Sequence, residues 1–334
     1  MKNNKLLLEI KNLRTYFYTQ KGVVKAVDDL DLSLEKGKTL CIVGESGCGK
    51  SVTSLSIMQL IQSPPGKIVS GTIKLNGENL LDLSENEMRK IRGNKISMIF
   101  QEPMTSLNPV FRIGDQISEV YIVHHKLNKA EALQKSIEML KLVGIPSPEK
   151  RVFDYPHQLS GGMRQRVMIA MSLASPNPLL LLADEPTTAL DVTIQAQILQ
   201  LMNELKERIG MSIILITHDM NVVSQMADQV IVMYAGKKIE EANVIDLFEN
   251  PLHPYTNGLL NSIPSNKKYR NRKRLETIRG TVPNLLHIGK GCPFANRCDY
   301  AEDICEKEFP PDKYFENNHL VRCHFVDKII KGRE

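Results

Sequence analysis

A glycine-rich run at residues 44–51 carries the residue types that bind phosphate groups. It follows the apolar run 39–43, which we predict to be a strand, and it opens a helix predicted from Lys50 to about Ile61. Glycines let backbone N–H groups curl around phosphate oxygens, and the positive end of the helix dipole favours the same anions. Lys50 would reach the phosphates and the Ser51 hydroxyl would ligate Mg²⁺. The residues assigned to this site are Gly44, Glu45, Ser46, Gly47, Cys48, Gly49, Lys50 and Ser51.

Two adjacent acids follow a second apolar run and supply the carboxylates that a nucleotide site needs. The run Leu179–Ala183 is predicted to be a buried strand, and Asp184 and Glu185 come directly after it. Doubly wound folds bind nucleotides at this carboxyl edge of the sheet. Asp184 is therefore placed to hold Mg²⁺, and Glu185 to polarise the water that attacks the terminal phosphate. Two acids at a strand end are ordinary by themselves, but the phosphate loop makes the catalytic interpretation the stronger one.

A serine and two glycines that open another helix indicate a second anion site. Ser160 can cap the helix, and the N–H groups of Gly161 and Gly162 are unhindered. One subunit has no use for two phosphate sites that flank one nucleotide. Two subunits packed head to tail do, because each then completes the site of the other.

The elements that position these residues alternate between helix and strand. From the second anion site onward, the predicted elements are helix Met163–Ala174, strand Leu179–Ala183, helix Val192–Ile209, strand Ser212–Thr217, a helix near Val222 and strand Val230–Tyr234. This alternation indicates an α/β fold with a parallel sheet covered on both faces. Earlier in the chain, helical periodicity extends between Ile113 and Val143. The earlier predicted strands are an antiparallel pair, Leu6–Phe17 and Val24–Leu34, followed by Gly71–Leu75 and Lys95–Phe100.

The composition favours a folded catalytic chain without a membrane span. Of its 334 residues, 42% are hydrophobic and 24% are charged. The net charge of +5 is spread along most of the chain, which does not favour nucleic acid as a partner. No window approaches about eighteen consecutive apolar residues, and no apolar stretch of signal-peptide type follows Met1–Lys5. We therefore expect a cytosolic or peripherally bound protein.

The motifs, in this order, resemble those of the ABC (ATP-binding cassette) ATPase family from about Leu6 to Glu241. The resemblance implies a phosphate-loop NTPase core with an antiparallel β subdomain and an inserted α-helical subdomain, binding ATP and Mg²⁺. It implies that Gln101 contacts Mg²⁺ or water and couples to a membrane partner. It also implies that His218 senses the γ-phosphate.

The same resemblance assigns residues that face a second subunit or the adenine ring. The signature residues Ser160, Gly161, Gly162 and Met163 would contact ATP held by the partner. Ala189–Asp191 resembles the D-loop, which places Asp191 at the dimer interface. Tyr16, Phe17 or Tyr18 should stack on adenine, and the strand register favours Phe17.

Several segments narrow the resemblance to the ATPases of dipeptide, oligopeptide and nickel importers, and to their D-type subunit. These segments are Phe100–Pro109, Tyr155–Gln158, Ala183–Thr193, His253–Thr256 and Arg279–Pro283. The implied assembly is a head-to-tail heterodimer with an F-type ATPase, beneath two integral membrane permease subunits at the cytoplasmic face of the membrane. A solute-binding protein would deliver the solute.

The transported solute stays open between dipeptides, longer peptides and nickel. A rival of another class is a soluble ABC ATPase that acts on nucleic acid or ribosomes. Such proteins usually carry two fused cassettes or long coiled-coil insertions, and this sequence has neither. A nucleotide kinase would not need the second anion site.

Four cysteines crowd into the carboxyl-terminal part of the chain: Cys292, Cys298, Cys305 and Cys323. In a cytosolic protein such a group indicates a metal before a disulfide. The gaps between the first three are longer than zinc sites usually show. The family resemblance favours a [4Fe–4S] cluster, with structural Zn²⁺ and unligated cysteines as alternatives. We predict a structural role, because a short segment with little apolar periodicity needs such a staple to fold, and redox sensing stays open.

The predicted domains are a nucleotide-binding domain at 1–250 and a carboxyl-terminal extension at 251–334. The helical insertion is placed at about 102–158. The basic stretch between Lys267 and Arg274 is predicted to be a solvated linker rather than a membrane or nucleic-acid site.

Overall fold

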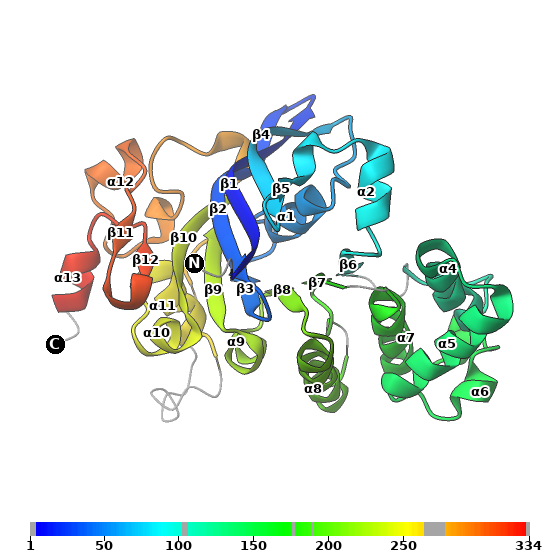
Figure 1. Cartoon of the computed structure of the whole chain (residues 1–334). Helices are drawn as coiled ribbons and strands as arrows, with labels where there is room; N and C mark the ends of the chain where they lie inside the picture. Colours follow the sequence, from blue (N-terminus) through cyan, green and yellow to red (C-terminus); the bar gives the residue numbers. More distant parts are fainter. Residues whose placement is uncertain (1–4, 102–105, 176–177, 189, 264–277, 332–334) are drawn as a thin grey trace. The chain divides into compact units, whose positions relative to one another are not determined.

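The computed structural model describes residues 5–101, 106–175, 178–188, 190–263 and 278–331. The chain folds into two compact units, each assembled from separate stretches of sequence, and their elements are labelled in Figure 1. The first unit comprises Met1–Leu7, Glu35–Gly37 and Asp82–Leu215. The second unit comprises Leu8–Leu34, Lys38–Leu81 and Ile216–Glu334.

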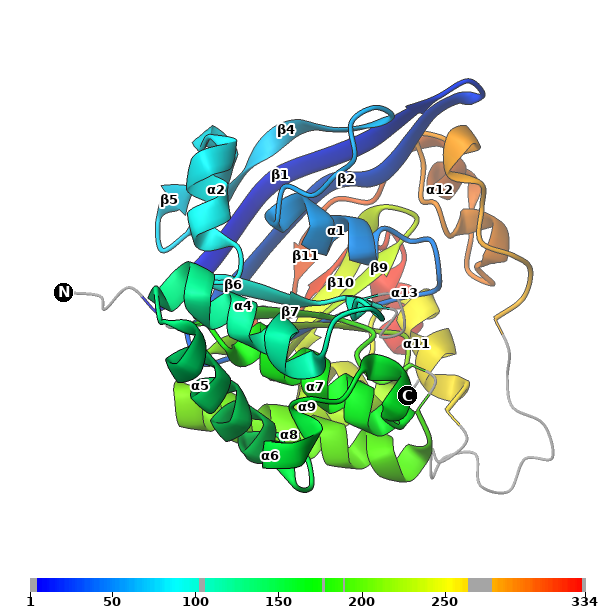
Figure 2. The same ribbon diagram turned by 90° about the vertical axis from the view of Figure 1, so that its right-hand side faces the viewer.

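One sheet of the second unit comes from the amino-terminal part of the chain and has the strand order β2-β1-β4-β5. Its strands are β1 (Leu6–Thr19), β2 (Gly22–Glu35), β4 (Gly66–Leu75) and β5 (Glu78–Asn79). The long strands β1 and β2 run side by side (Figure 2) and are joined by a turn at Gln20 and Lys21. β1 also pairs antiparallel with β4, with Ile10 opposite Ile73. The predicted antiparallel pair is confirmed, and both strands are longer than their apolar patterns indicate.

The second unit also contains the strand order β11-β12-β10-β9-β3. These strands are β3 (Thr39–Val43), β9 (Gln229–Tyr234), β10 (Lys237–Asn243), β11 (Lys313–Tyr314) and β12 (Leu320–Val321). β3 and β9 are parallel, with Cys41 opposite Val230, and every residue of β3 is buried. β10 is antiparallel to both β9 and β12. The carboxyl-terminal segment thus extends the sheet that leads into the phosphate loop.

Strand β10 was not predicted from the sequence, because most of its residues are polar. One of them, Glu240, is nevertheless 0% exposed. The Glu240 carboxylate accepts hydrogen bonds from the backbone N–H groups of Leu252 (2.6 Å) and His253 (2.9 Å). The Nε2 atom of His319 lies 2.7 Å from the same carboxylate. A buried charge is tolerated when such partners satisfy it, and here they come from residues distant in sequence.

The helices of the second unit are α1 (Lys50–Ile57), α9 (Met220–Met226), α10 (Val244–Glu249), α11 (Pro254–Asn261), α12 (Asp303–Lys307) and α13 (Val326–Lys331). Short 3₁₀ turns lie at Leu285–His287, Ala295–Arg297 and Glu316–Asn318. Helix α1 ends before the predicted end near Ile61, because the chain turns at Gln59, which has a φ of 49°. The Gln59 side chain donates a hydrogen bond to the Leu80 carbonyl and holds this turn.

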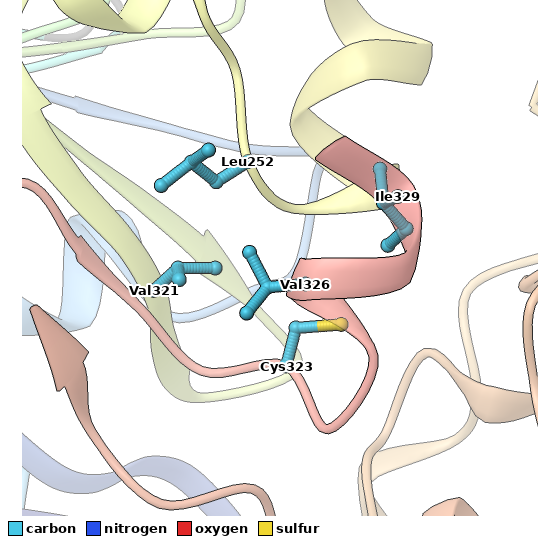
Figure 3. Packing of buried hydrophobic residues seen from close by; sticks show 5 residues of the cluster. All are labelled: Leu252, Val321, Cys323, Val326 and Ile329. Carbon is cyan, nitrogen blue, oxygen red and sulfur yellow. The ribbon is translucent and has the colours of Figure 1, made fainter. Parts of the chain in front are cut away.

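The carboxyl-terminal segment has a small apolar core of its own. Figure 3 shows the five buried residues of this cluster: Leu252, Val321, Cys323, Val326 and Ile329. They come from β12, the loop that follows it, α13 and the chain before α11, so each short segment supplies only one or two side chains. No apolar periodicity can develop over elements of this length, which explains why the sequence pattern fades after Pro251.

The first unit contains the parallel strands β6 (Ile96–Ile99) and β7 (Leu180–Asp184), with Ile96 opposite Leu180. Strand β8 (Ser212–Thr217) begins beside β7, where the Ser212 N–H donates to the Leu179 carbonyl at 2.9 Å. β7 is fully buried, as the apolar run predicts. The predicted bounds of β8 agree with the structure residue for residue.

The helices of the first unit are α2 (Glu85–Ile91), α4 (Ile113–His125), α5 (Lys129–Leu142), α6 (Pro148–Arg151), α7 (Gly161–Leu173) and α8 (Val192–Ile209). The helices α4 to α7 gather in one group (green in Figure 1). The periodic stretch between Ile113 and Val143 is two helices, because Lys126 takes a left-handed φ of 58° and Asn128 caps the next helix. Residues 102–105 of the predicted insertion, Ala189 and the basic stretch lie outside the described residues.

Candidate functional site

The glycine-rich loop 44–51 connects β3 to α1 in the second unit, as the sequence predicts. Gly44 has a φ of 151°, and a Cβ there would lie 2.2 Å from the carbonyl oxygen of Met233. Gly49 has a φ of 102°, and a Cβ there would lie 2.1 Å from the carbonyl oxygen of Ala26. Both positions therefore require glycine, since any side chain would strike the backbone of a neighbouring segment.

Lys50 lies within this loop and is 5% exposed. Its Nζ donates to the carbonyl oxygens of Gly44 (2.7 Å) and Glu45 (3.0 Å). Ser51 follows in the first turn of α1, and Gly47 is exposed at the loop tip with open space around it. The loop thus brings together an ammonium group, a hydroxyl and an accessible backbone, the donors that a polyphosphate requires.

Cys48 is buried inside the loop rather than available for chemistry. Burial raises the pKa of its thiol, although Lys50 acts in the opposite direction. A thiol with a raised pKa stays protonated near neutral pH and is a poor nucleophile. Cys48 therefore fills space between the loop and its neighbours.

Glu45 connects the loop to the carboxyl-terminal segment, a link that no sequence pattern revealed. The Glu45 N–H donates to the Tyr255 hydroxyl at 2.7 Å. The Arg297 guanidinium donates to both carboxylate oxygens of Glu45, at 2.6 Å and 3.1 Å. Tyr255 belongs to the segment His253–Thr256, one of the segments on which the family resemblance rests.

The three candidate aromatic residues on β1 have different surroundings. The Tyr16 hydroxyl donates to Asp28 at 2.6 Å, and burial together with this bond raises the pKa of Tyr16. Tyr18 is 51% exposed. Phe17 is half-buried and alternates with Tyr16, on the same side as Thr15. The Thr15 hydroxyl lies 2.8 Å from that of Ser56 in α1, so this side of β1 faces the helix that the phosphate loop opens.

In the first unit, Glu185 directly follows β7 and lies beside Gln101. Asp184 is 4% exposed. The Gln101 Nε2 donates to Glu185 Oε2 at 3.3 Å, and the Thr188 hydroxyl donates to the same oxygen at 2.9 Å. Glu185 has a φ of 47°, in the left-handed region that non-glycine residues seldom adopt. Strained backbone of this kind gathers at functional sites, where it aims a side chain.

The signature residues open helix α7, also in the first unit. Ser160 caps this helix, because its side chain accepts from the Met163 N–H at 3.3 Å. Ser160 and Gly161 are exposed, and nothing lies near a Cβ built on Gly161. A Cβ on Gly162 would lie 2.8 Å from the Ile194 side chain. The amino end of α7 is thus open to a ligand or a second subunit.

Asp191 and His218 both lie at element ends, as predicted. Asp191 is exposed and caps α8, because its Oδ1 accepts from the Ile194 N–H at 2.9 Å. His218 is exposed and directly follows β8, in the second unit. Asp191 therefore has a structural role within its own subunit, whatever contact it makes with another.

The four carboxyl-terminal cysteines lie in the second unit and line a common cavity. One small cavity is lined by all four and by two histidines: Cys292, Cys298, Cys305, Cys323, His253 and His324. The Cys292 N–H donates to the Cys305 carbonyl at 2.7 Å. Burial raises the pKa of Cys292 to about 12 and that of Cys323 to about 11.

His253 adds a buried N–H group to this cavity. It is 1% exposed, and its Nδ1 accepts from the Tyr255 N–H at 3.1 Å, which leaves the proton on Nε2. Within the described part of the chain, Nε2 has no hydrogen-bond partner. Burial lowers the pKa of His253 to about 4, so the ring is neutral near pH 7.

Among the residues that the structure describes, no three His, Cys, Asp or Glu side chains are arranged to hold a metal ion. The predicted iron–sulfur or zinc staple therefore stays a prediction. No helix among the described ranges is both long and apolar enough to cross a membrane.

Two family patterns match the chain. The ABC transporter family matches residues 27–188, and the carboxyl-terminal region of oligopeptide/dipeptide transporters matches residues 239–305. The first match includes the phosphate loop, the signature residues, and the two acids Asp184 and Glu185 at the end of β7. The second includes Tyr255 and Arg297, the residues that contact Glu45.

Curated relatives match the chain over nearly its whole length. The oligopeptide transport ATP-binding protein AppD of Bacillus subtilis is 54% identical over 322 residues, which is 96% of this chain and 97% of AppD. The dipeptide transport ATP-binding protein DppD of Bacillus subtilis is 49% identical over 322 residues, covering 96% of this chain and 95% of DppD. Among solved structures, the dimeric ATP-binding cassette MJ0796 bound to ADP and Pi is 29% identical with a TM-score of 0.64, over 71% of this chain and 99% of MJ0796.

The fold and the site define an ABC ATP-binding cassette, an α/β ATPase. Within that class, the chain belongs to the ATP-binding subunits of the oligopeptide/dipeptide transporter family.

Proposed function

We propose that this chain energises the import of dipeptides or oligopeptides by hydrolysing ATP for an ABC transporter. The observation that carries the proposal is the nearly full-length similarity to AppD and DppD, whose names assign them to oligopeptide and dipeptide transport. This similarity extends through region 239–305, beyond the cassette that all ABC transporters share. Nickel is the alternative cargo within the same family.

We assign roles in ATP binding and hydrolysis to residues of each unit. Lys50 and the amides of loop 44–51 bind the phosphates. Ser51 in the second unit, and Asp184 and Gln101 in the first, would be ligands of Mg²⁺, which would neutralise developing charge on the phosphates. Glu185 polarises the attacking water, and its hydrogen bonds from Gln101 and Thr188 support this role because they fix the carboxylate. His218 senses the γ-phosphate, and Phe17 stacks on adenine.

The signature residues act on ATP held by a second subunit. The open amino end of α7, with Ser160 and Gly161 exposed, supports this proposal. MJ0796, a cassette of similar fold, forms a dimer. We assign the partner here as an F-type ATPase packed head to tail, with Asp191 and Met163 at the interface.

An exposed apolar patch in the first unit is suited to bind the permease subunits. Val110, Phe111 and Phe153 are 71%, 54% and 48% exposed. Backbone bonds join the neighbouring segments, since the Ile113 N–H donates to the Asp154 carbonyl at 2.9 Å. Large apolar side chains gathered on a surface mark contact sites for other proteins. We place the membrane coupling segment here, at the cytoplasmic face of the membrane, with a solute-binding protein on the opposite side.

In this proposal the four cysteines would hold a [4Fe–4S] cluster, with zinc as the alternative. Their convergence on one cavity supports it, and cysteine thiolates are the usual ligands of such clusters. A single Zn²⁺ would need its sulfurs within roughly 4 Å of one another. The His253 Nε2–H fits a cluster as a donor to sulfur, and its tautomer does not suit direct ligation of a metal. The cluster would then cross-link the short elements of the extension proposed at 251–334.

Uptake by cells tests the proposed function. A strain lacking this chain should fail to take up labelled dipeptides or oligopeptides, and the wild-type gene should restore uptake. The Glu185→Gln variant should not restore it, although it should still associate with the membrane subunits. Normal peptide uptake in the deletion strain, with loss of nickel uptake instead, would assign the chain to nickel import.

A further inference from the structure

Glu45, the second residue of the phosphate loop, is held on all sides by other residues of the second unit. Arg297 Nη1 donates to Glu45 Oε2 at 2.6 Å, and Arg297 Nη2 donates to Glu45 Oε1 at 3.1 Å. The Tyr255 hydroxyl accepts from the Glu45 N–H at 2.7 Å. Lys50 Nζ donates to the Glu45 carbonyl at 3.0 Å. The side chain and both backbone groups of this one loop residue are therefore fixed.

Arg297 is itself immobilised by the residues around it, and its side chain is 5% exposed. Its Nε donates to the Arg279 carbonyl at 2.7 Å, and its Nη1 also donates to the Tyr234 hydroxyl at 3.1 Å. The guanidinium carbon lies 5.8 Å from the ring centroids of both Tyr234 and Phe294. The paired hydrogen bonds to one carboxylate suit the planar fork of arginine, and lysine cannot make them.

The position of Glu45 has a direct effect on the phosphate-binding lysine. Lys50 Nζ donates to the carbonyl oxygens of Gly44 and Glu45, so a shift of Glu45 moves one of the two atoms that anchor the ammonium group. Displacements of about 1 Å in a binding or catalytic group cost up to about 100-fold in rate. A residue that restrains Glu45 therefore acts on phosphate binding without touching the nucleotide.

We propose that Arg297 is a positioning residue of the ATP site, which holds the phosphate loop through Glu45. The oligopeptide/dipeptide-type region at 239–305 is then part of the nucleotide site rather than an appendage. The role requires ATP binding by this chain, and it does not depend on the transported solute or on the metal.

The test is ATP affinity, measured by titration calorimetry on the full-length chain, together with KM and kcat for hydrolysis. Arg297→Ala should weaken ATP binding about tenfold, or about 1.4 kcal/mol, with a matching rise in KM and little change in kcat. Arg297→Lys keeps the charge and should recover part of the affinity. Arg279→Ala is the matched control, because it lies in the same segment, is 86% exposed and keeps the carbonyl that Arg297 uses. It should bind ATP like the wild type.

A double-mutant cycle with Glu45→Gln shows whether Arg297 acts through Glu45. The double variant should bind ATP no more weakly than the weaker single variant, because both changes break the same contact. Fully additive losses would overturn the proposal. So would a lower melting temperature in Arg297→Ala with unchanged ATP affinity, since that outcome indicates a structural role alone. If Arg297→Ala does not fold, Arg297→Lys and Glu45→Gln decide the question by the same readouts.

Discussion

The phosphate loop and the cysteine segment lie in the same unit, but different forces hold them in shape. In the loop, Gly44 and Gly49 approach neighbouring carbonyl oxygens so closely that the backbone itself sets the conformation. The segment between Cys292 and Cys323 consists of short elements held by side chains. Arg322 in that segment, for example, donates to Asp312 at 2.6 Å and to the Lys238 carbonyl at 3.2 Å.

Because of this difference, we expect substitutions in the two regions to have different effects. A loop shaped by its backbone presents its donors in a fixed pattern, so a change there alters chemistry first. A segment shaped by side chains depends on each contact and on what its cysteines bind, so a change there alters stability first. The ion pair between Glu45 and Arg297 connects the phosphate loop to the cysteine segment.

The largest effect is expected at the lysine of the loop. Lys50→Ala removes the only ammonium group that the loop supplies to the phosphates, and ATP affinity should fall about 1,000-fold, or about 4 kcal/mol. Titration calorimetry measures this loss. Lys11→Ala, at a side chain that is 61% exposed on β1, is the control and should leave affinity unchanged. Equal ATP affinity in both variants would show that this loop does not bind ATP.

A smaller loss, in turnover rather than binding, is expected at the acid after β7. Glu185→Gln keeps the shape of the side chain but removes the base, so kcat should fall at least about 100-fold while ATP affinity is kept. Phosphate release under saturating ATP measures the effect. Glu204→Gln on the exposed side of α8 is the control. Undiminished hydrolysis in Glu185→Gln would show that another group polarises the water.

The cysteine segment should respond in stability and colour. Wild-type protein prepared without oxygen should be brown, with broad visible absorbance from iron and sulfide. Cys298→Ser should lose that colour and about 2 kcal/mol of the free energy of unfolding, while ATP affinity changes less than in Lys50→Ala. Cys41→Ala in β3 is a cysteine change outside the segment and should keep the colour. A colourless wild-type protein that contains one zinc and no iron would show that the cysteines bind zinc and not an iron–sulfur cluster.

The smallest effect is expected on the adenine side. Phe17→Ala should weaken ATP binding about fivefold, because stacking of this kind contributes about 1 kcal/mol. Tyr18→Ala should have little effect, since Tyr18 is on the opposite side of β1 and half of its surface is exposed. The reverse ranking in a binding titration would move the stacking role to Tyr18.

Much of the phosphate site could be predicted because its constraints are local in sequence. Loop 44–51 is one uninterrupted run, and the predicted bounds of β8 and α8 match the structure. The carboxyl-terminal contacts could not be predicted in the same way. Glu45 and Arg297 are 252 residues apart, and β10 hides a buried glutamate whose partners lie elsewhere in the chain. Periodicity predicts which face of a helix or strand is apolar, but it does not predict which charged residue from a distant part of the sequence will contact that element.

The most direct test measures ATP hydrolysis by the complete transporter in proteoliposomes, with its permease subunits, partner ATPase and solute-binding protein. We expect hydrolysis to rise when the binding protein carries a dipeptide or oligopeptide, and peptide to accumulate in step with phosphate release. The Glu185→Gln variant should abolish both. Hydrolysis that is indifferent to peptide and rises with nickel, or with nucleic acid, would contradict a role in peptide import.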